Sequence, residues 1–370
     1  MFTPPSENHP TDEHPASGMR RPKVLFICGS LNQTTQMHQV ADQLVECDRF
    51  FTNYFDEGYT NVLKRLRLAE MTPLGHKLSA RTIAYLERHN LPIDPAGRNG
   101  PYDLVLTCSD LVVPGSIRRY PVVLVQEGMT DPEGFWFRVW RRYRWFPRWL
   151  AGTAVTGLSG EYTMFCVASE GYRRHFVSRG ADPEKIVVTG IPNFDNCRRF
   201  CDNTFPYRGF VLVCTSDVRE TFGREDRKSF ILNAVRIANG RQLIFKLHPN
   251  ERAGRATREI ERHAPAALVY QTGSAEEMIA NCSVLITRYS STAYVGLALG
   301  KEVHSDFDVE DLRQKLPIQT GTAAQQIAAV CRRMLSGVPD AAQEKVARHQ
   351  HAQTGVSDLP EYASARELLE

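Results

Sequence analysis

The chain alternates short apolar runs with segments of helical periodicity along most of its length. Runs such as Lys23–Cys28 and 243–247 are rich in valine, leucine, isoleucine and phenylalanine, which is typical of buried strands. Strands that alternate with helices form βα units, because neighbouring parallel strands need a crossover connection. The sequence therefore predicts an α/β protein with parallel sheets.

The chain has 370 residues, more than one hydrophobic core usually supports, so we expect two doubly wound domains that face a cleft. The strands expected in the first sheet are Lys23–Cys28, Leu104–Thr107, Val122–Val125, 165–168 and 186–189. Those expected in the second sheet are 210–215, 243–247, Leu268–Tyr270 and 284–287. The predicted divisions are a polar tail (1–20), a first domain (21–193), a linker (194–208), a second domain (209–335) and C-terminal helices (336–370).

Composition restricts the class of partner. The 45 basic and 42 acidic residues leave a formal charge of +3, too little for a nucleic-acid footprint over the whole molecule. The nine cysteines form no C-x-x-C pair and no Asp-x-Asp motif ends a strand, so we expect no metal site. No stretch approaches the roughly twenty apolar residues of a membrane span. These features predict a cytoplasmic protein with no nucleic-acid partner.

Polar residues follow two predicted strands of the second sheet. His248 and Pro249 follow one strand, and Ser290, Ser291 and Thr292 follow another and precede a predicted helix. In open α/β sheets, ligands bind beyond the carboxyl ends of the strands. An imidazole, hydroxyls and a helix N-terminus at that edge predict a nucleotide diphosphate site. The alternative is that His248 caps its strand and Ser290 caps the next helix.

Further candidates follow other predicted strands. Thr215, Ser216 and Arg219 follow the first strand of the second sheet, where Arg219 either pairs with a phosphate or lies on the surface. In the first domain, a Gly29-Ser30-Leu31-Asn32 loop joins a strand to a helix, and Gln126-Glu127-Gly128 ends a strand. Glu127 is a candidate base toward a hydroxyl, or else part of an ordinary polar turn.

The segments 165–172 and 180–195 resemble the end of the first domain in many glycosyltransferases and in UDP-N-acetylglucosamine 2-epimerases, which have the two-domain fold called GT-B. The His-Pro and Ser-Ser pairs are similar to motifs of bacterial polysialyltransferases and of capsule or teichoic-acid transferases, which use CMP- or CDP-linked donors. The resemblance implies that His248, Pro249 and Ser290 to Thr292 hold the donor phosphates, together with Thr215, Ser216 and Arg219. It also implies a catalytic role for His248, which would assist departure of the nucleotide.

Those transferases carry an acidic pair before a glycine in the first domain, and the second acid serves as base toward the acceptor hydroxyl. The resemblance assigns that role to Glu127, while Gln126 departs from the first acid. The resemblance also places Gly29, Ser30, Asn32, Gln126 and Gly128 near the acceptor. Many UDP-sugar enzymes carry an acid in the helix after the second phosphate loop, and the helix expected at 292–299 has none.

The segment 135–150 holds all four tryptophans of the chain, interleaved with arginines. Such a pattern suits a peripheral contact with a membrane or a lipid-linked acceptor. It also suits stacking on a glycan or a single-stranded nucleic acid. If the segment is helical, its apolar residues can instead form an ordinary core stripe with solvated arginines opposite.

The expected function is a metal-independent glycosyltransferase, or a related phospho-polyol transferase. It would move a group from a UDP-, CDP- or CMP-linked donor to a hydroxyl of a surface-polysaccharide or lipid-linked acceptor at the inner face of the membrane. One alternative is a nucleotide-sugar 2-epimerase, which the missing acid opposes. A second is a non-catalytic protein that binds nucleotide sugars.

Overall fold

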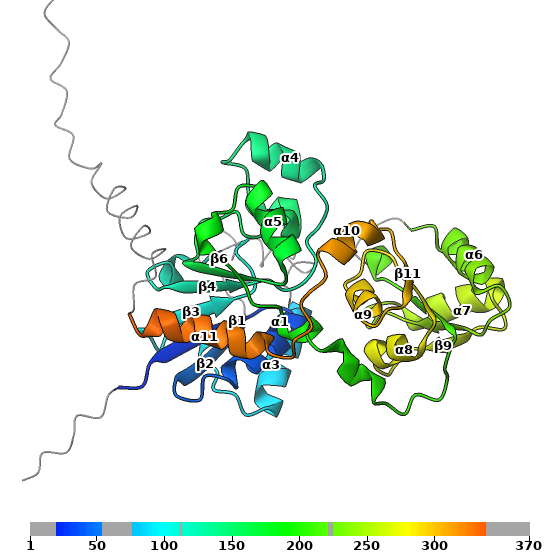
Figure 1. Cartoon of the computed structure of the whole chain (residues 1–370), viewed down its shortest axis with the longest axis horizontal. Coiled ribbons are helices and arrows are strands. Elements are labelled where there is room, and N and C mark those ends of the chain that lie inside the picture. Colours follow the sequence, from blue (N-terminus) through cyan, green and yellow to red (C-terminus); the bar gives the residue numbers. More distant parts are fainter. Residues whose placement is uncertain (1–19, 54–75, 112, 221–224, 338–370) are drawn as a thin grey trace, which may run out of the picture.

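The computed structural model describes residues 20–53, 76–111, 113–220 and 225–337. Within them the chain forms two α/β domains, each around its own parallel sheet (Figure 1). Among these residues, no helix is both long and apolar enough to cross a bilayer. The predicted fold class is confirmed.

The first domain contains a six-stranded sheet with the order β2-β1-β3-β4-β5-β6, in which all pairs are parallel. Its strands are β1 (Lys23–Cys28), β2 (Asp48–Asn53), β3 (Leu104–Thr107), β4 (Val122–Val125), β5 (Met164–Val167) and β6 (Ile186–Val188). Its helices are α1 (Leu31–Ala41), α3 (His76–Arg88), α4 (Phe135–Arg142) and α5 (Glu170–Ser178). The central strands are buried on both faces, as helices on both sides of a parallel sheet require.

The second domain contains a five-stranded parallel sheet with the order β11-β10-β7-β8-β9. Its strands are β7 (Val211–Cys214), β8 (Leu243–Lys246), β9 (Leu268–Tyr270), β10 (Val284–Ile286) and β11 (Glu302–His304). Its helices are α6 (Arg227–Ala238), α7 (Ala253–His263), α8 (Ala275–Asn281), α9 (Thr292–Ala298) and α10 (Val309–Gln314). The strand β7 lies between β8 and β10, so the two predicted phosphate loops are separated by one strand.

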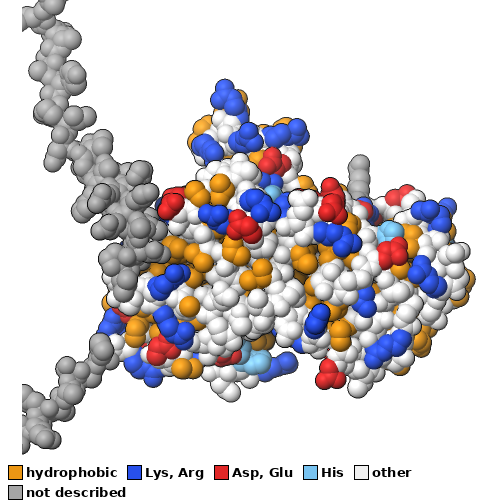
Figure 2. Space-filling view, viewed as in Figure 1, with side chains coloured by type: hydrophobic (Ala, Val, Ile, Leu, Met, Phe, Trp, Pro, Cys, Tyr) orange, Lys and Arg blue, Asp and Glu red, His pale blue; other side chains and the backbone are white. Residues whose placement is uncertain are grey.

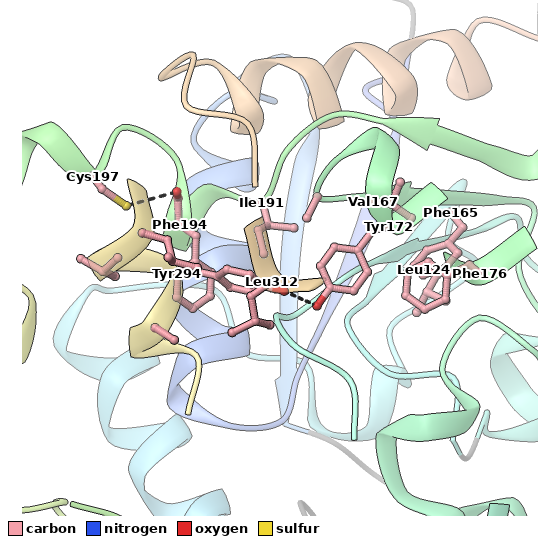
Figure 3. Close-up of a cluster of buried hydrophobic side chains, with 14 of the residues drawn as sticks. Leu124, Phe165, Val167, Tyr172, Phe176, Ile191, Phe194, Cys197, Tyr294 and Leu312 are labelled. Atoms are coloured by element: carbon pink, nitrogen blue, oxygen red, sulfur yellow. Dashed lines mark hydrogen bonds between the residues drawn. The ribbon is translucent and has the colours of Figure 1, made fainter. Parts of the chain in front are cut away.

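The two domains share an apolar contact. Tyr294 of α9 is 1% exposed, and its ring lies 6.0 Å from the ring of Phe194. Its hydroxyl is 2.5 Å from that of Tyr172 in α5, and Leu312 of α10 belongs to the same cluster (Figure 3). Buried side chains of both sheets form one continuous cluster through this contact. The domains are therefore joined by a packed interface as well as by the chain.

The last described helix, α11 (Ala323–Leu335), returns to the first domain. Ile327 and Cys331 pack among the side chains of β1 and α1, and Arg332 pairs with Glu46 at 2.7 Å. Asp195, just after β6, accepts hydrogen bonds from the backbone of Gly321 and Ala323 at 2.7 and 2.8 Å and so fixes the start of α11.

This position corrects the predicted boundary, which placed 323–335 in the second domain. The apolar face of α11 covers the first sheet rather than the second. The predicted linker 194–208 begins at the end of the short helix Pro192–Phe194 and contains the short helix Cys197–Cys201, and Phe194 is buried in the interface. The predicted tail and most of the predicted C-terminal helices lie outside the described residues.

Candidate active site

One carboxylate of the first domain faces the loop after β1. Ser30 caps α1 by accepting a hydrogen bond from the backbone of Gln33. Glu127, which follows β4, accepts hydrogen bonds from Ser30 Oγ (2.8 Å), Asn32 Nδ2 (3.3 Å) and Gln33 Nε2 (2.6 Å). A carboxylate offers about four acceptor sites. The donors therefore fix the position of Glu127 and leave it capacity to accept a proton.

The predicted neighbours of Glu127 have different roles. The side chain of Gln126 is 1% exposed, accepts from the backbone of Ala168 (2.9 Å) and donates to the carbonyl of Gly128 (2.7 Å). Gln126 therefore ties β4 to β5 and offers no polar atom to a ligand, which corrects its expected acceptor contact. Gly128 is buried, and a side chain there would meet the ring of Phe194.

A pocket of about 300 Å³ lies between the domains next to this loop. Its first-domain and linker residues are Asn32, Thr35, Asn193, Phe194, Arg199 and Phe200, and its second-domain residues are Glu276, Ser291, Thr292 and Val295. This volume is at the lower end of the range for small-molecule sites in proteins.

The linker side of the pocket is organised by Asn193. Its Nδ2 donates to the carbonyl and to Oδ1 of Asn32 at 2.7 and 2.6 Å, and its Oδ1 accepts from Gln39 at 2.8 Å. Arg199 lies over the ring of Phe200 at 4.8 Å and pairs with no carboxylate among the described residues. On this side, the pocket is therefore lined by the hydrogen-bonded amides of Asn193 and Asn32 and by the exposed guanidinium of Arg199.

The second-domain side of the pocket carries hydroxyls. Ser290 Oγ and Thr292 Oγ1 are 2.9 Å apart, and the backbone of Thr292 donates to Ser290 Oγ. Ser290 therefore closes the turn before α9, whereas the N-cap residue of the helix is Ser291. Ser291 makes no side-chain capping bond, and both Ser291 and Thr292 line the pocket. These two hydroxyls are the part of the predicted phosphate site that the structure brings to the pocket.

His248 and Pro249 do not line this pocket. His248 follows β8, and parallel strands are about 4.8 Å apart, so its loop lies roughly 10 Å from the loop after β10. The backbone of His248 donates to Thr215 Oγ1 (3.0 Å), and its Nδ1 lies 3.6 Å from Asp217 Oδ2. The side chain of His248 is 37% exposed and so is open to a ligand larger than the pocket.

A hydrogen bond between the domains lies beside His248. Arg81 of α3 donates to Asn250 Oδ1 at 2.9 Å, and Asn250 Nδ2 donates to Asp217 at 2.9 Å. The neighbouring Thr82 donates to the carbonyl of Gly29 at 2.9 Å. The helix α3 therefore contacts both the loop after β1, at Gly29, and the loop after β8, at Asn250.

Arg219 takes part in a charge cluster inside the second domain. Its guanidinium is 15% exposed and contacts Glu259 (2.9 Å), Glu251 (3.2 Å) and Glu225 (3.4 Å). Thr215 Oγ1 donates to the same Glu251 at 2.6 Å. Arg219 and Thr215 are thus bound to carboxylates, which corrects their expected phosphate contacts. Ser216 is buried, and its hydroxyl has no protein partner among the described residues.

Lys246 is a structural lysine. Burial lowers its pKa, and its Nζ donates to the carbonyls of Leu247 and Gln271 at 3.0 and 3.3 Å. Across the described residues, no cluster of three or more histidine, cysteine or acidic side chains could hold a metal ion.

No protein-family model and no curated protein matches the sequence. Several solved structures match its fold. The UDP-GlcNAc 2-epimerase of Neisseria meningitidis bound to UDP-GlcNAc has a TM-score of 0.51 at 15% identity and covers 84% of this chain and 100% of its own. The S. aureus MnaA structure with UDP has 0.51 at 14%, covering 93% and 100%. The UDP-GlcNAc 2-epimerase of Methanocaldococcus jannaschii with UDP-GlcNAc and UDP has 0.50 at 12%, covering 89% and 99%. At these identities the likeness shows a shared GT-B-like fold.

Proposed function

We propose that this chain is an enzyme that acts on a nucleotide sugar bound between its two domains. The observation that carries the proposal is the pocket in which Ser291 and Thr292 of the second domain face the Asn32 loop that holds Glu127. Hydroxyl donors and the guanidinium of Arg199, which pairs with no carboxylate among the described residues, suit a diphosphate. Solved structures with the same fold contain UDP-GlcNAc or UDP, which supports this ligand class.

The reaction that we propose first is 2-epimerisation, because the matching structures include enzymes with that name. Inversion at carbon 2 of a sugar requires that its C–H bond be broken and remade on the other face. Glu127 would accept that proton, with Ser30, Asn32 and Gln33 fixing its carboxylate, while the electrons of the C–H bond form a double bond between carbons 1 and 2 and the nucleoside diphosphate leaves carbon 1. Return of a proton to the other face of carbon 2 and re-addition of the bound diphosphate to carbon 1 would complete the inversion. Ser291, Thr292 and Arg199 would stabilise the charge on the diphosphate.

A second candidate is transfer of the sugar, or of a related phospho-polyol, to a hydroxyl acceptor. The His-Pro and Ser-Ser motifs favour it, and so does α9, in which Thr292–Ala298 contains no acid for a UDP ribose. In this reaction Glu127 would deprotonate the acceptor hydroxyl. A CMP- or CDP-linked donor extended from the pocket toward His248 would contact both loops.

Incubation with UDP-GlcNAc in deuterated water, followed by proton NMR, separates the two reactions. An epimerase would exchange the hydrogen at carbon 2 and produce the second epimer without any acceptor. A transferase would leave the sugar unchanged until an acceptor is added. Thermal shifts with UDP, CDP and CMP provide the binding control, because a ligand at a hundred times its Kd adds about 2.7 kcal/mol. No shift with any of them would contradict both reactions.

A further inference from the structure

The structure divides the side chains of 135–150 into an inward and an outward set. Phe137 and Trp140 of α4, each 2% exposed, point inward. They pack in a small separate core with Ala151, Ala154 and Val155. The interpretation as a core stripe therefore holds for Phe137 and Trp140 and does not account for the exposed rings of the same segment.

This small core is fixed to the first domain by ion pairs. Arg148 contacts the buried carboxylate of Asp110 at 3.2 Å and donates to two backbone carbonyls. Arg179, the C-cap residue of α5, pairs with Glu133 at 3.0 Å and lies over the ring of Phe137 at 5.5 Å. The outward side chains are thus held by an anchored scaffold, and Figure 1 shows α4 standing out from the first sheet.

The outward set contains large exposed rings. The exposed fractions are 63% for Phe135, 48% for Trp136, 48% for Tyr143 and 82% for Trp145. Trp136 stacks on Phe146 with centroids 5.5 Å apart, and Trp145 lies edge-on to the same ring. We call Phe135, Trp136, Tyr143 and Trp145 the aromatic surface. Exposed apolar side chains gathered in this way mark interaction sites.

Uncompensated positive charge surrounds the aromatic surface. The segment 134–160 contains five arginines and no acidic residue. Arg138, Arg141, Arg142 and Arg144 are exposed and pair with no carboxylate in the part of the chain that the structure describes. Figure 2 shows these basic side chains beside hydrophobic ones on the protrusion. Since the whole chain carries only +3, the charge is a local feature.

We propose that the aromatic surface and its arginines dock on an anionic phospholipid bilayer. Tryptophan, tyrosine and phenylalanine rings favour the boundary between headgroups and acyl chains, and arginines bind lipid phosphates while their stems lie along apolar matter. A single-stranded nucleic acid is bound in a basic groove that follows its backbone, whereas these rings lie on a protrusion. The proposal does not depend on which nucleotide-sugar reaction the chain carries out.

Vesicle sedimentation tests the proposal with the full chain. Vesicles of phosphatidylcholine mixed with phosphatidylglycerol should bind the protein, vesicles of phosphatidylcholine alone should bind it weakly, and added salt should release it. The variant Arg138→Gln/Arg141→Gln/Arg142→Gln should lose roughly a hundredfold in partitioning, because each arginine contributes about a fivefold factor near an anionic surface. The matched control Lys228→Gln/Arg236→Gln/Arg262→Gln removes the same charge from the second domain and should bind like wild type.

Tryptophan fluorescence gives an independent readout, because every tryptophan of the chain lies in this segment. Anionic vesicles should shift the emission to the blue, brominated lipids should quench it, and Trp145→Phe should remove most of the response. Both variants change exposed side chains, so their melting temperatures should equal that of wild type. Unchanged emission, wild-type binding by the arginine variant, or binding of a single-stranded oligonucleotide in place of vesicles would each overturn the proposal.

Discussion

Glu127 is held by three donors from a single turn of chain, Ser30, Asn32 and Gln33. This arrangement gives its carboxylate one orientation, which is what proton transfer at a defined atom requires. A glutamine amide at this position keeps one acceptor oxygen, which Ser30 and Asn32 can still bind, and its NH₂ group can donate to the side-chain oxygen of Gln33 once that amide turns over. Replacement by glutamine therefore removes the basic oxygen and keeps the shape.

We expect Glu127→Gln to lower turnover of the nucleotide sugar by a factor of about 10² to 10⁴, the usual contribution of a general acid or base. The thermal shift with the nucleotide should persist, because the hydroxyls of Ser291 and Thr292 are unchanged. Glu261→Gln, at an exposed position of α7 that does not line the pocket, removes the same charge and serves as the control. Full activity in Glu127→Gln would favour the non-catalytic alternative.

His175 of α5 adds a pH dependence to stability. Burial, with help from the nearby cations of Arg179 and Lys315, lowers its pKa to about 3, while Asp311 opposes the shift. The unfolded chain binds a proton below pH 6.5 that the folded chain does not bind. The contribution of neutral His175 is therefore complete above about pH 6.5 and is lost as the pH falls toward 3.

His175→Gln should reduce this loss. The difference in melting temperature between wild type and variant should shrink or change sign in favour of the variant as the pH falls from 7 to 4. Calorimetric scans across that range measure it. A difference that stays constant with pH would show that His175 takes up a proton equally in both states.

The sequence identifies some of the pocket residues that follow strands and misses those that the linker and α3 contribute to the domain contact. Glu127, Ser291 and Thr292 were predicted because each follows an apolar run, and parallel strands bring their carboxyl ends to one edge. Asn193, Arg199 and Arg81 were missed. Their roles depend on how one domain lies against the other, and no local pattern encodes that contact.

The strands themselves follow from the hydrophobic pattern wherever the run is largely apolar. The strands β1, β3, β4 and β9 were predicted with their observed bounds. The strands β2 and β11 were missed, because Asp48–Asn53 and Glu302–His304 each contain charged or polar residues and bury only some of their side chains. The other two edge strands, β6 and β9, contain only apolar and aromatic residues and were predicted.

The close packing of α5 against the C-terminal end of α10 can be tested by a substitution. A Cβ added at Gly171 would lie 1.9 Å from the carbonyl oxygen of Gln314. Gly171→Ala should force the two elements apart and lower the free energy of unfolding by about 1–3 kcal/mol. Denaturant unfolding measures the change.

The control for Gly171→Ala is Gly254→Ala in α7. There the nearest atom to an added Cβ is the flexible end of Arg258 at 3.8 Å, so alanine should stabilise the helix by about 0.5–1 kcal/mol. Equal changes in the free energy of unfolding for the two substitutions would contradict the close approach between α5 and the end of α10.

At the scale of the whole molecule, the apolar contact around Tyr294 and the return of α11 couple the two domains. We expect a single unfolding transition. Ile327→Ala, a fully buried change on α11, should lower the free energy of unfolding by about 2–5 kcal/mol and keep the transition single. Leu232→Ala on the exposed face of α6 should change it by less than about 0.5 kcal/mol. Differential scanning calorimetry that resolves two peaks would contradict this coupling.

The chain leaves the first domain near Asp195 and returns to it near Gly321 and Ala323. The hydrogen bonds that Asp195 accepts from these two residues hold the two segments together. In topological terms the second domain is an insertion within the first, since all five of its strands lie in one uninterrupted stretch. The two domains therefore differ in what each loses when the chain is cut into fragments. A fragment that spans β7 to β11 keeps its entire sheet and the Ser291 loop, whereas any truncation before α11 strips a covering helix from the first sheet. The excised second domain would retain Glu276, Ser291, Thr292 and Val295 of the pocket and would lack Glu127.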